Sequence, residues 1–208
     1  MAGKPRYTKS FQRLRRNLSR GRTLLDKFFD NPGGTRRGSG QPAAHEQELL
    51  RSVLVLGIGA LDAYLSELVV ELMPKLAAAG KAQMIFERLM KDNAGLILQA
   101  VYLGREALDA ALSSAVELQF QSSVMHGSKA VRQVYDWCAL GLGFDDFNTE
   151  RFPQAMKLLD EWTDKRHRIV HRGELVKMRR QDATDVLDLV ESIGKTLNDR
   201  ALRTPEAT

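Results

Sequence analysis

The residues best suited to chemistry gather in one short stretch late in the chain. Arg166, His167 and His171 lie within the hexapeptide RHRIVH, and the tripeptide RGE, which contains Glu174, follows directly. Histidine changes its charge nearest to neutral pH and can act as a general acid or base. Arginine offers a planar, bidentate set of donors to a phosphate. The stretch therefore predicts either phosphate chemistry or phosphate binding.

Three interpretations of this stretch are open. In the first, it is a metal-independent ribonuclease site, where an imidazole activates the 2′-hydroxyl of RNA and a guanidinium stabilises the phosphorane charge. In the second, His167 and His171 at four-residue spacing bind zinc together with Glu174, although the sequence has no HExxH motif and no nearby cysteine to complete the set. In the third, it is a solvated basic helix end that binds phosphate at most.

Helix geometry limits the first interpretation. On a straight helix Arg166 and His171 are about 140° apart, so a regular helix does not direct both at one small substrate. We expect either that the helix unwinds here or that Arg166 reaches around it. Ile169 and Val170 should then face the core, and Arg166, His167 and His171 should lie toward one cleft edge. One motif also offers little for protonating the leaving 5′-oxygen. Two motifs facing each other would supply two histidines and two arginines, which predicts a homodimer.

A second polar group lies in the apolar segment GALDAY, which contains Asp62 and Tyr64. A buried carboxylate needs a hydrogen-bonding partner, and Arg166 is one candidate for Asp62. A half-exposed position of Asp62 on a helix edge is the other interpretation.

The spacing of apolar residues predicts the elements that carry these groups. Leucine and alanine recur every three or four residues and no long alternating run occurs, which indicates an all-α protein. A long helix is predicted from about Ala44 to Ala78, in which Gly57 and Gly59 would admit a close neighbour. Two helices follow between residues 82 and 120, with a break near Asn93 or at Gly104.

Three helices are predicted in the C-terminal part of the chain, each with its own end signals. The first spans residues 129–140, with Ser128 as its N-cap and Gly141 and Gly143 at its end. The second is capped by Asn148 or Thr149, has Pro153 in its first turn and leads into RHRIVH. The third opens with Asp182 and Asp185 as a capping box, and its core face carries Val186, Leu189, Val190, Ile193 and Leu197.

The net charge of +5 is unevenly distributed, because residues 1–44 carry +9 and the remainder carries −4. Residues 8–30 form a basic amphipathic helix, whose apolar face comprises Phe11, Leu14, Leu18, Leu25, Phe28 and Phe29. The helix is expected either to dock on the body as an accessory element or to act as a free nucleic-acid-binding arm. We divide the chain into a basic helix with a Gly/Pro-rich linker (1–43), a helical domain (44–203) and a tail (204–208).

The composition also indicates in which cellular compartment the protein is expected. The single cysteine, Cys138, cannot form an internal disulfide, excludes a cysteine-rich metal site and is expected to be buried. The most apolar stretch, residues 53–61, is ended by Asp62 and is shorter than the roughly 20 residues of a membrane span. No apolar run follows the basic N-terminus, so no signal peptide is expected. We expect a soluble cytoplasmic protein with no cofactor and no membrane partner.

The order Arg166, polar His167, three residues, His171 resembles the Arg-x4–6-His signature of the HEPN superfamily, and RHRIVHRGE is most similar to its RiboL-PSP branch. The segment LLRSVLVLGIGALDAYLSELV (Leu49–Val69) resembles the first core helix of that branch, including its Ala-Leu-Asp-x-Tyr run. The QFQSS segment and the helix after it, Gln119–Leu140, give a weaker third similarity. The resemblance covers about Glu46–Arg200 and is loose between Ala79 and Leu118.

The resemblance implies a HEPN-like helical bundle that dimerises with its motifs apposed and cleaves RNA without a metal, often in toxin–antitoxin or phage-defence systems. Arg166 would orient the scissile phosphate, His171 would be the general acid or base, and His167 the polar auxiliary. Asp62, Tyr64 and Glu174 would support the site. An antitoxin or another defence protein would be a partner, and some relatives only bind RNA or protein. Candidate RNA-binding side chains are Arg168, Arg172, Lys177, Arg179 and Arg180.

Overall fold

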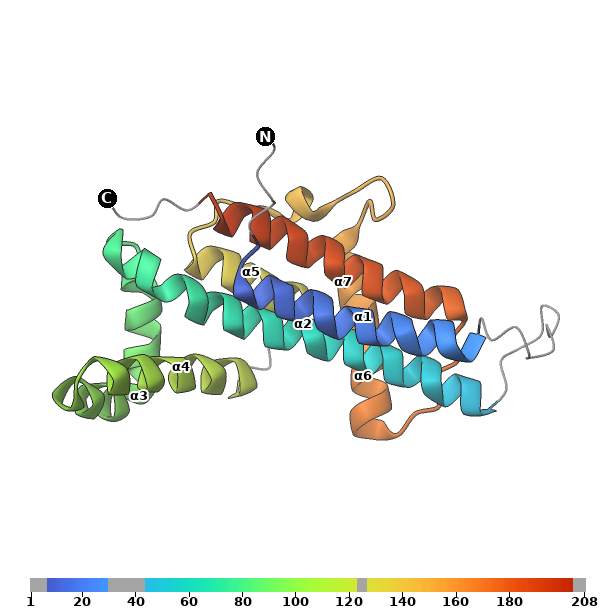
Figure 1. Ribbon diagram of the computed structural model, residues 1–208, viewed down its shortest axis with the longest axis horizontal. Helices are drawn as coiled ribbons and strands as arrows, with labels where there is room; N and C mark the ends of the chain where they lie inside the picture. Colours follow the sequence, from blue (N-terminus) through green and yellow to red (C-terminus); the bar gives the residue numbers. More distant parts are fainter. Residues whose placement is uncertain (1–6, 30–43, 123–126, 204–208) are drawn as a thin grey trace.

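The computed structural model describes residues 7–29, 44–122 and 127–203, and every regular element in these ranges is helical (Figure 1). The all-α prediction is therefore confirmed. The predicted linker at residues 33–42 and the tail at 204–208 lie outside the described residues. The elements are α1 (Lys9–Phe29), α2 (Ala44–Ala78), α3 (Gln83–Leu103), α4 (Arg105–Ser122), α5 (Ser128–Trp137), the 3-10 helix η1 (Phe144–Phe147), α6 (Ala155–Arg172) and α7 (Arg180–Ala201).

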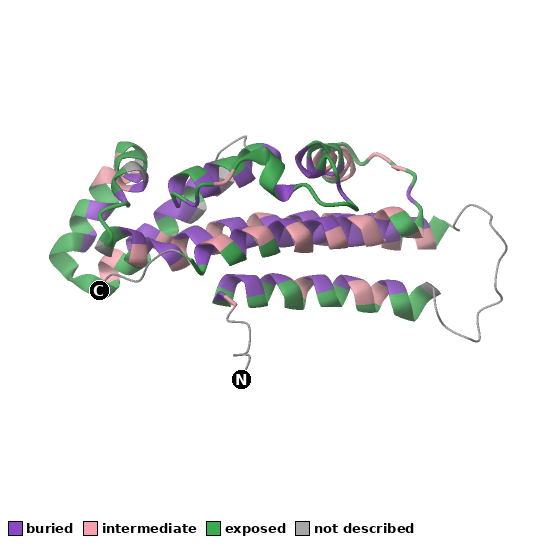
Figure 2. Ribbon diagram, turned by 90° about the horizontal axis from the view of Figure 1, so that it is seen from above, coloured by how far each residue is buried: buried purple, intermediate pink, exposed green. Residues whose placement is uncertain are grey.

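Helix α2 is the central element, because α1, α4, α5, α6 and α7 all pack against it. Seen from above, α1 lies on one side of the layer formed by α2 and α7, while α5 and α6 lie on the other side (Figure 2). Helix α6 crosses this layer steeply, and its C-terminal end projects below α2 in Figure 1. The basic N-terminal helix and the RHRIVH segment therefore lie on opposite sides of the bundle.

Helix α1 is part of the core rather than a free arm. Its side chains Phe11, Leu14, Leu18 and Leu25 are buried in the same cluster as the apolar face of α7. The Glu71 carboxylate of α2 accepts hydrogen bonds from the first backbone N–H groups of α1, at Lys9 and Ser10. The docked interpretation of this helix is the one the structure supports. Phe28 departs from the predicted apolar face, since 57% of it is exposed.

The length of α2 agrees with the prediction, and one of its two glycines has the expected role. A Cβ at Gly57 would lie 3.1 Å from Val186 Cγ1 of α7, so the absent side chain permits close packing. Nothing lies within 4 Å of a Cβ at Gly59, so that part of the prediction is wrong. By length and composition Ala44–Ala77 could cross a membrane, but 56% of its most apolar window is buried inside the protein. This burial favours a core helix.

Helices α3 and α4 form a hairpin that projects from the bundle (Figure 1). Both predicted breaks occur: Gly104 separates the two helices, and Asn93 has non-helical backbone angles within α3. The hairpin carries many of the exposed large apolar side chains of the described residues, namely Leu96, Leu98, Val101, Tyr102, Leu103 and Leu118.

The ends of α5 differ from those predicted. The helix starts at Ser128 itself, and Asp160 of α6 accepts hydrogen bonds from the Ser128 backbone N–H and hydroxyl, both at 2.8 Å. Ser128 is therefore held by a distant carboxylate instead of acting as the N-cap. At the other end the helix stops at Trp137, and Ala139 takes the left-handed conformation (φ 48°). Of the two glycines expected at this end, Gly141 also takes it (φ 62°) and Gly143 does not (φ −119°).

The starts of α6 and α7 are also set by side chains near the expected positions. The predicted cap at Asn148 or Thr149 is wrong, because α6 begins at Ala155 with Gln154 at the cap position, and Pro153 precedes the helix. The Asn148 amide oxygen still accepts a hydrogen bond from the Ala155 N–H. In α7 the Asp182 carboxylate accepts from the Arg179 N–H at 2.8 Å. Asp182 thus occupies the third helical position and not the cap, so the predicted capping box is displaced by one turn.

Candidate functional site

The RHRIVH segment forms the last turns of α6 and keeps a regular helical backbone. The helix ends at Arg172, and Gly173 follows in the left-handed conformation, φ 63°, with its N–H donating to the Arg168 carbonyl oxygen. Glycine adopts this conformation without steric cost, which explains the abrupt end. The expectation that the helix unwinds at the motif is therefore wrong.

His167 and His171 are brought together, as their spacing of one helical turn requires. Their ring centroids are 4.6 Å apart and the ring planes are tilted by 38°. Both side chains are exposed. The two imidazoles form a pair on the surface, which we call the histidine pair, and together they could take up and release protons at one substrate.

Arg166 leaves α6 in a different direction. The side chain is half-buried, and its Nε is fully buried with no hydrogen-bond partner among the described residues. Trp162 Nε1 and Thr163 Oγ1, one turn earlier on the helix, are also buried without described partners. Because the helix stays regular, Arg166 remains about 140° from His171. Of the predicted trio, the structure brings His167 and His171 into contact, whereas Arg166 starts from another side of the helix.

The two apolar residues of the motif behave differently. Ile169 is half-buried and packs against the core as predicted. Val170 is 46% exposed, so the expectation that it faces the core is wrong. The reason is the 100° step between successive residues, which turns Val170 away when Ile169 faces inward.

Glu174 neutralises a neighbouring arginine. Arg168 Nε donates to Glu174 Oε2 at 2.7 Å, and Arg172 Nη1 lies 3.7 Å from Oε1. The hydrogen bond from Arg168 lowers the pKa of Glu174, and the same bond raises the pKa of Arg168. Glu174 therefore supports the segment by fixing Arg168, which leaves that guanidinium less free for a phosphate than Arg172.

Sequence reasoning missed two residues of α2 that hold the loop after the motif. The Gln47 amide accepts from the Met178 N–H at 3.0 Å and donates to the Met178 carbonyl at 2.8 Å. Arg51, which is only 6% exposed, donates to the Val176 carbonyl and pairs with Glu48. The sequence does contain a sign of this role: Gln47 and Arg51 occupy the apolar face of α2 beside Leu50, where a polar side chain needs a hydrogen-bonding partner.

The predicted supporting residues of the GALDAY segment lie in the middle of α2. Tyr64 is 1% exposed, and its hydroxyl donates to the Gly194 carbonyl of α7 at 3.1 Å. Burial raises the pKa of Tyr64 well above its ordinary value. Asp62 is half-buried, which is the second of the two positions considered for it. Tyr64 therefore joins α2 to α7 and can support the site only through the fold.

The remaining predicted cations line the start of α7 and the preceding loop. Lys177 and Arg179 are exposed, and Arg180 is half-buried. No group of three or more His, Cys, Asp or Glu side chains that could hold a metal ion occurs among the described residues. Since Glu174 is bound to Arg168, the zinc interpretation lacks its third ligand in this part of the chain.

Comparisons with models of protein families, with curated proteins and with solved structures gave no significant match. The resemblance to the HEPN superfamily stays a prediction.

Proposed function

We propose that this protein is a metal-independent endoribonuclease of the HEPN type, acting as a homodimer in the cytoplasm, with a role in toxin–antitoxin or phage-defence systems. The single observation that carries the proposal is the exposed histidine pair at the end of α6, with ring centroids 4.6 Å apart. Two imidazoles at one surface point supply proton transfer without a cofactor.

The proposed reaction begins with the ribose 2′-hydroxyl. An imidazole removes its proton, the 2′-oxygen attacks phosphorus, and the bond to the 5′-oxygen breaks as that oxygen takes a proton from a protonated imidazole. The products are a 2′,3′-cyclic phosphate and a 5′-hydroxyl. His171 is the proposed acid or base, His167 its polar auxiliary, and Arg166 the group that stabilises the phosphorane.

The homodimer follows from the direction of Arg166. Because Arg166 and His171 leave one helix about 140° apart, a phosphate held by both needs groups from two chains. Exposed apolar side chains beside the histidine pair suit such an interface, since Val170 is 46% and Leu175 is 75% exposed. We expect Val170→Asp with Leu175→Asp to give a monomer, whereas Val101→Asp with Leu103→Asp on the α3–α4 hairpin leaves the oligomeric state unchanged.

The decisive test compares wild type with His171→Ala on single-stranded RNA in the presence of EDTA. General acid–base catalysis typically contributes about 10²–10⁴-fold, so the variant should lose at least a hundredfold in cleavage rate with an unchanged circular dichroism spectrum. The cleaved ends should be 2′,3′-cyclic phosphates and 5′-hydroxyls. Wild-type cleavage by the variant, or a strict metal requirement, would remove the nuclease assignment. Lys157→Ala, an exposed change on the same helix, is the matched control.

A second candidate is a non-catalytic module that binds RNA or a protein. It is favoured by one observation, the buried Arg166 Nε, because a buried nitrogen cannot donate a hydrogen bond to a phosphorane on another molecule. This candidate predicts RNA binding that weakens with salt and leaves the RNA intact. Expression in a host cell separates the two: toxicity relieved by His171→Ala supports the nuclease, and equal tolerance supports the module.

A further inference from the structure

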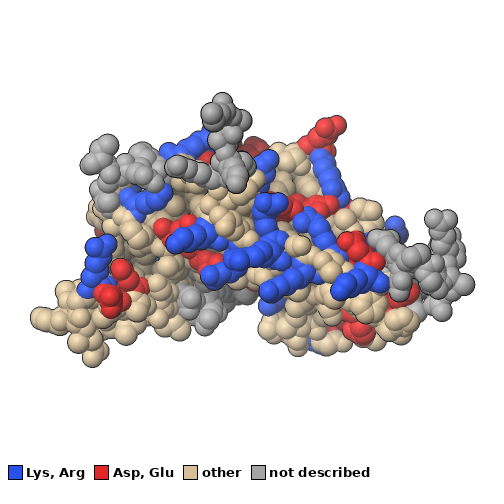
Figure 3. Space-filling view, viewed as in Figure 1, with Lys and Arg blue, Asp and Glu red and all other residues tan. Residues whose placement is uncertain are grey.

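The outward face of α1 carries a line of cations that we call the α1 stripe: Lys9, Arg16, Arg20 and Lys27. At 100° per residue these four positions fall within about 20° of one line along the helix. With a rise of 1.5 Å per residue the line is about 27 Å long. All four side chains are exposed. Lys and Arg side chains gather across the middle of the face on which α1 lies in front (Figure 3).

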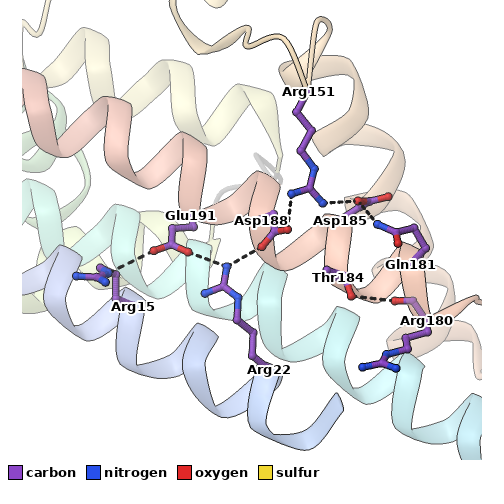
Figure 4. Close-up of polar contacts among 9 residues, drawn as sticks. All are labelled: Arg15, Arg22, Arg151, Arg180, Gln181, Thr184, Asp185, Asp188 and Glu191. Carbon is purple, nitrogen blue, oxygen red and sulfur yellow. Dashed lines mark hydrogen bonds and ion pairs between the residues drawn. The ribbon is translucent and has the colours of Figure 1, made fainter. Parts of the chain in front are cut away.

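The α1 stripe is not neutralised by the protein itself. None of its four side chains forms an ion pair with a described residue, and Arg20 makes only a 3.4 Å contact to the Asn17 amide oxygen. Two other arginines of α1 differ: Arg22 binds Asp188 and Glu191 at 2.7 Å, and Arg15 binds Glu191. Figure 4 shows that these contacts point from α1 toward α7. These carboxylates of α7 therefore pair with arginines next to the stripe and not with the four cations of the stripe itself.

Cations that pair with a carboxylate of the protein differ from unpaired cations, which can bind an external anion. Arg151 pairs with two α7 carboxylates, Asp185 and Asp188, at 2.9 and 2.7 Å. Charges that already have close partners add little attraction for an external anion. The four cations of the α1 stripe have no carboxylate partner among the described residues, and like charges on one line repel one another unless a polyanion lies across them.

We infer that the α1 stripe binds the sugar–phosphate backbone of single-stranded RNA. Arginine forms bidentate contacts with phosphate, and a line of four cations can contact about four phosphates of one strand. An anionic membrane fits less well, because a helix that binds lipid inserts its apolar face. The apolar face of α1 is already committed, since Phe11, Leu14 and Leu18 are at most 2% exposed.

The position of the α1 stripe defines its role. It lies on the opposite side of the α2–α7 layer from α6, so it does not share a surface with the histidine pair of its own chain (Figure 2). A short RNA at the histidine pair therefore does not reach the stripe, whereas a long RNA that passes around the bundle does. The choice of RNA as the polyanion rests on the proposed function. The stripe then raises the affinity for long substrates without taking part in the chemistry.

The test replaces the whole stripe with neutral residues, Lys9→Gln, Arg16→Gln, Arg20→Gln and Lys27→Gln. A control variant loses the same charge elsewhere, at four exposed cations outside α1: Arg88→Gln, Lys91→Gln, Arg105→Gln and Lys129→Gln. Binding of an oligouridylate of about 30 nucleotides is measured in the His171→Ala background at several salt concentrations. Each single-strand phosphate contact contributes about 0.7 to the slope of log K against log salt, so four lost contacts reduce it by about 2.8.

If the stripe variant and the wild type bind RNA equally at 1 M salt, a slope difference of about 2.8 makes the affinity of the stripe variant up to about 600-fold lower than that of the wild type at 0.1 M salt. The affinity of the control variant should change little. If the two variants lose affinity equally, or if anionic vesicles bind the wild type as tightly as the RNA does, the inference is overturned. Should the fourfold variant fold poorly, Arg16→Gln with Arg20→Gln is measured instead, and the expected reduction in slope is about 1.4.

Cleavage of a trinucleotide, UpUpU, with His171 intact separates this inference from the proposed function. The trinucleotide should be cut at the same rate by the stripe variant and by the wild type. An uncut trinucleotide combined with a stripe-dependent affinity for long RNA removes the nuclease and keeps the stripe. A cut trinucleotide combined with an unchanged slope removes the stripe and keeps the nuclease.

Discussion

Substitution of Gly194 tests whether α1 is locked against α7 as the structure requires. A Cβ at Gly194 would overlap Leu14 Cδ2 and lie 3.1 Å from Phe11 Cε2. Leu14 and Phe11 are 1% and 2% exposed, so neither has free space into which it can move. We therefore expect Gly194→Ala to force α1 away from α7.

Two opposing effects set the magnitude. Overpacking a buried contact costs about 1–3 kcal/mol. Replacing glycine with alanine inside a helix returns about 1 kcal/mol of helix propensity. Gly59→Ala isolates the second effect, because nothing lies within 4 Å of a Cβ at that position of α2. Gly59→Ala should stabilise the protein by about 1 kcal/mol, and Gly194→Ala should be less stable than Gly59→Ala by about 1–3 kcal/mol.

Urea unfolding followed by circular dichroism gives the free energy of unfolding of each variant, with an unchanged m value as the sign that only stability has changed. A double-mutant cycle sharpens the assignment: in a Leu14→Ala background the overlap with Leu14 Cδ2 is gone, so Gly194→Ala should destabilise by less than it does in the wild type. If Gly194→Ala and Gly59→Ala are equally stabilising, α1 is not packed on α7, and the α1 stripe has no fixed position.

Two further predictions concern the segment that follows α5. Ala139→Gly should stabilise the protein by about 1 kcal/mol, because Ala139 holds φ 48° and only glycine adopts this region without strain. Gly141→Ala, at φ 62°, should destabilise it by about as much. Thermal unfolding measures both variants, and midpoints that shift in the same direction would contradict the assignment. Burial raises the pKa of the Cys138 thiol to about 12, so this neutral thiol stabilises the fold fully below the ordinary thiol pKa, and that contribution is lost as pH rises from about 9 toward 12. Cys138 should resist iodoacetamide until urea unfolds the chain, and rapid labelling of the native protein would show that it is not buried.

Much of the fold could be predicted because helical periodicity is a local property of the sequence. The bounds of α2 agree with the spacing of its apolar residues, and the core face of α7 is buried along its length as the pattern requires. Helix ends were less predictable, because partners far away in the sequence decide them. Asp160 fixes the start of α5 across more than thirty residues, and no local pattern around Ser128 records this.

The candidate site was predictable to the same degree. Four-residue spacing alone places His167 beside His171, and the structure has them in contact. The loop after the motif depends instead on Gln47 and Arg51, which lie more than 120 residues away in the sequence. Their importance follows from a polar side chain on an apolar face, but the identity of the partner emerges only from the packing of α2 against residues 173–179.

Whether two chains share one catalytic site can be tested by mixing inactive subunits. Arg166→Ala and His171→Ala should each abolish cleavage as homodimers. In a mixed dimer one site keeps Arg166 from one chain and His171 from the other, so an equal mixture after subunit exchange should recover about a quarter of wild-type activity. Exchange is verified by copurification through a tag on one subunit. If the exchanged mixture stays inactive, the two groups do not act across chains. Arg166 would then have to act in its own chain, where its Nε is buried and the direction of the side chain diverges from that of His171.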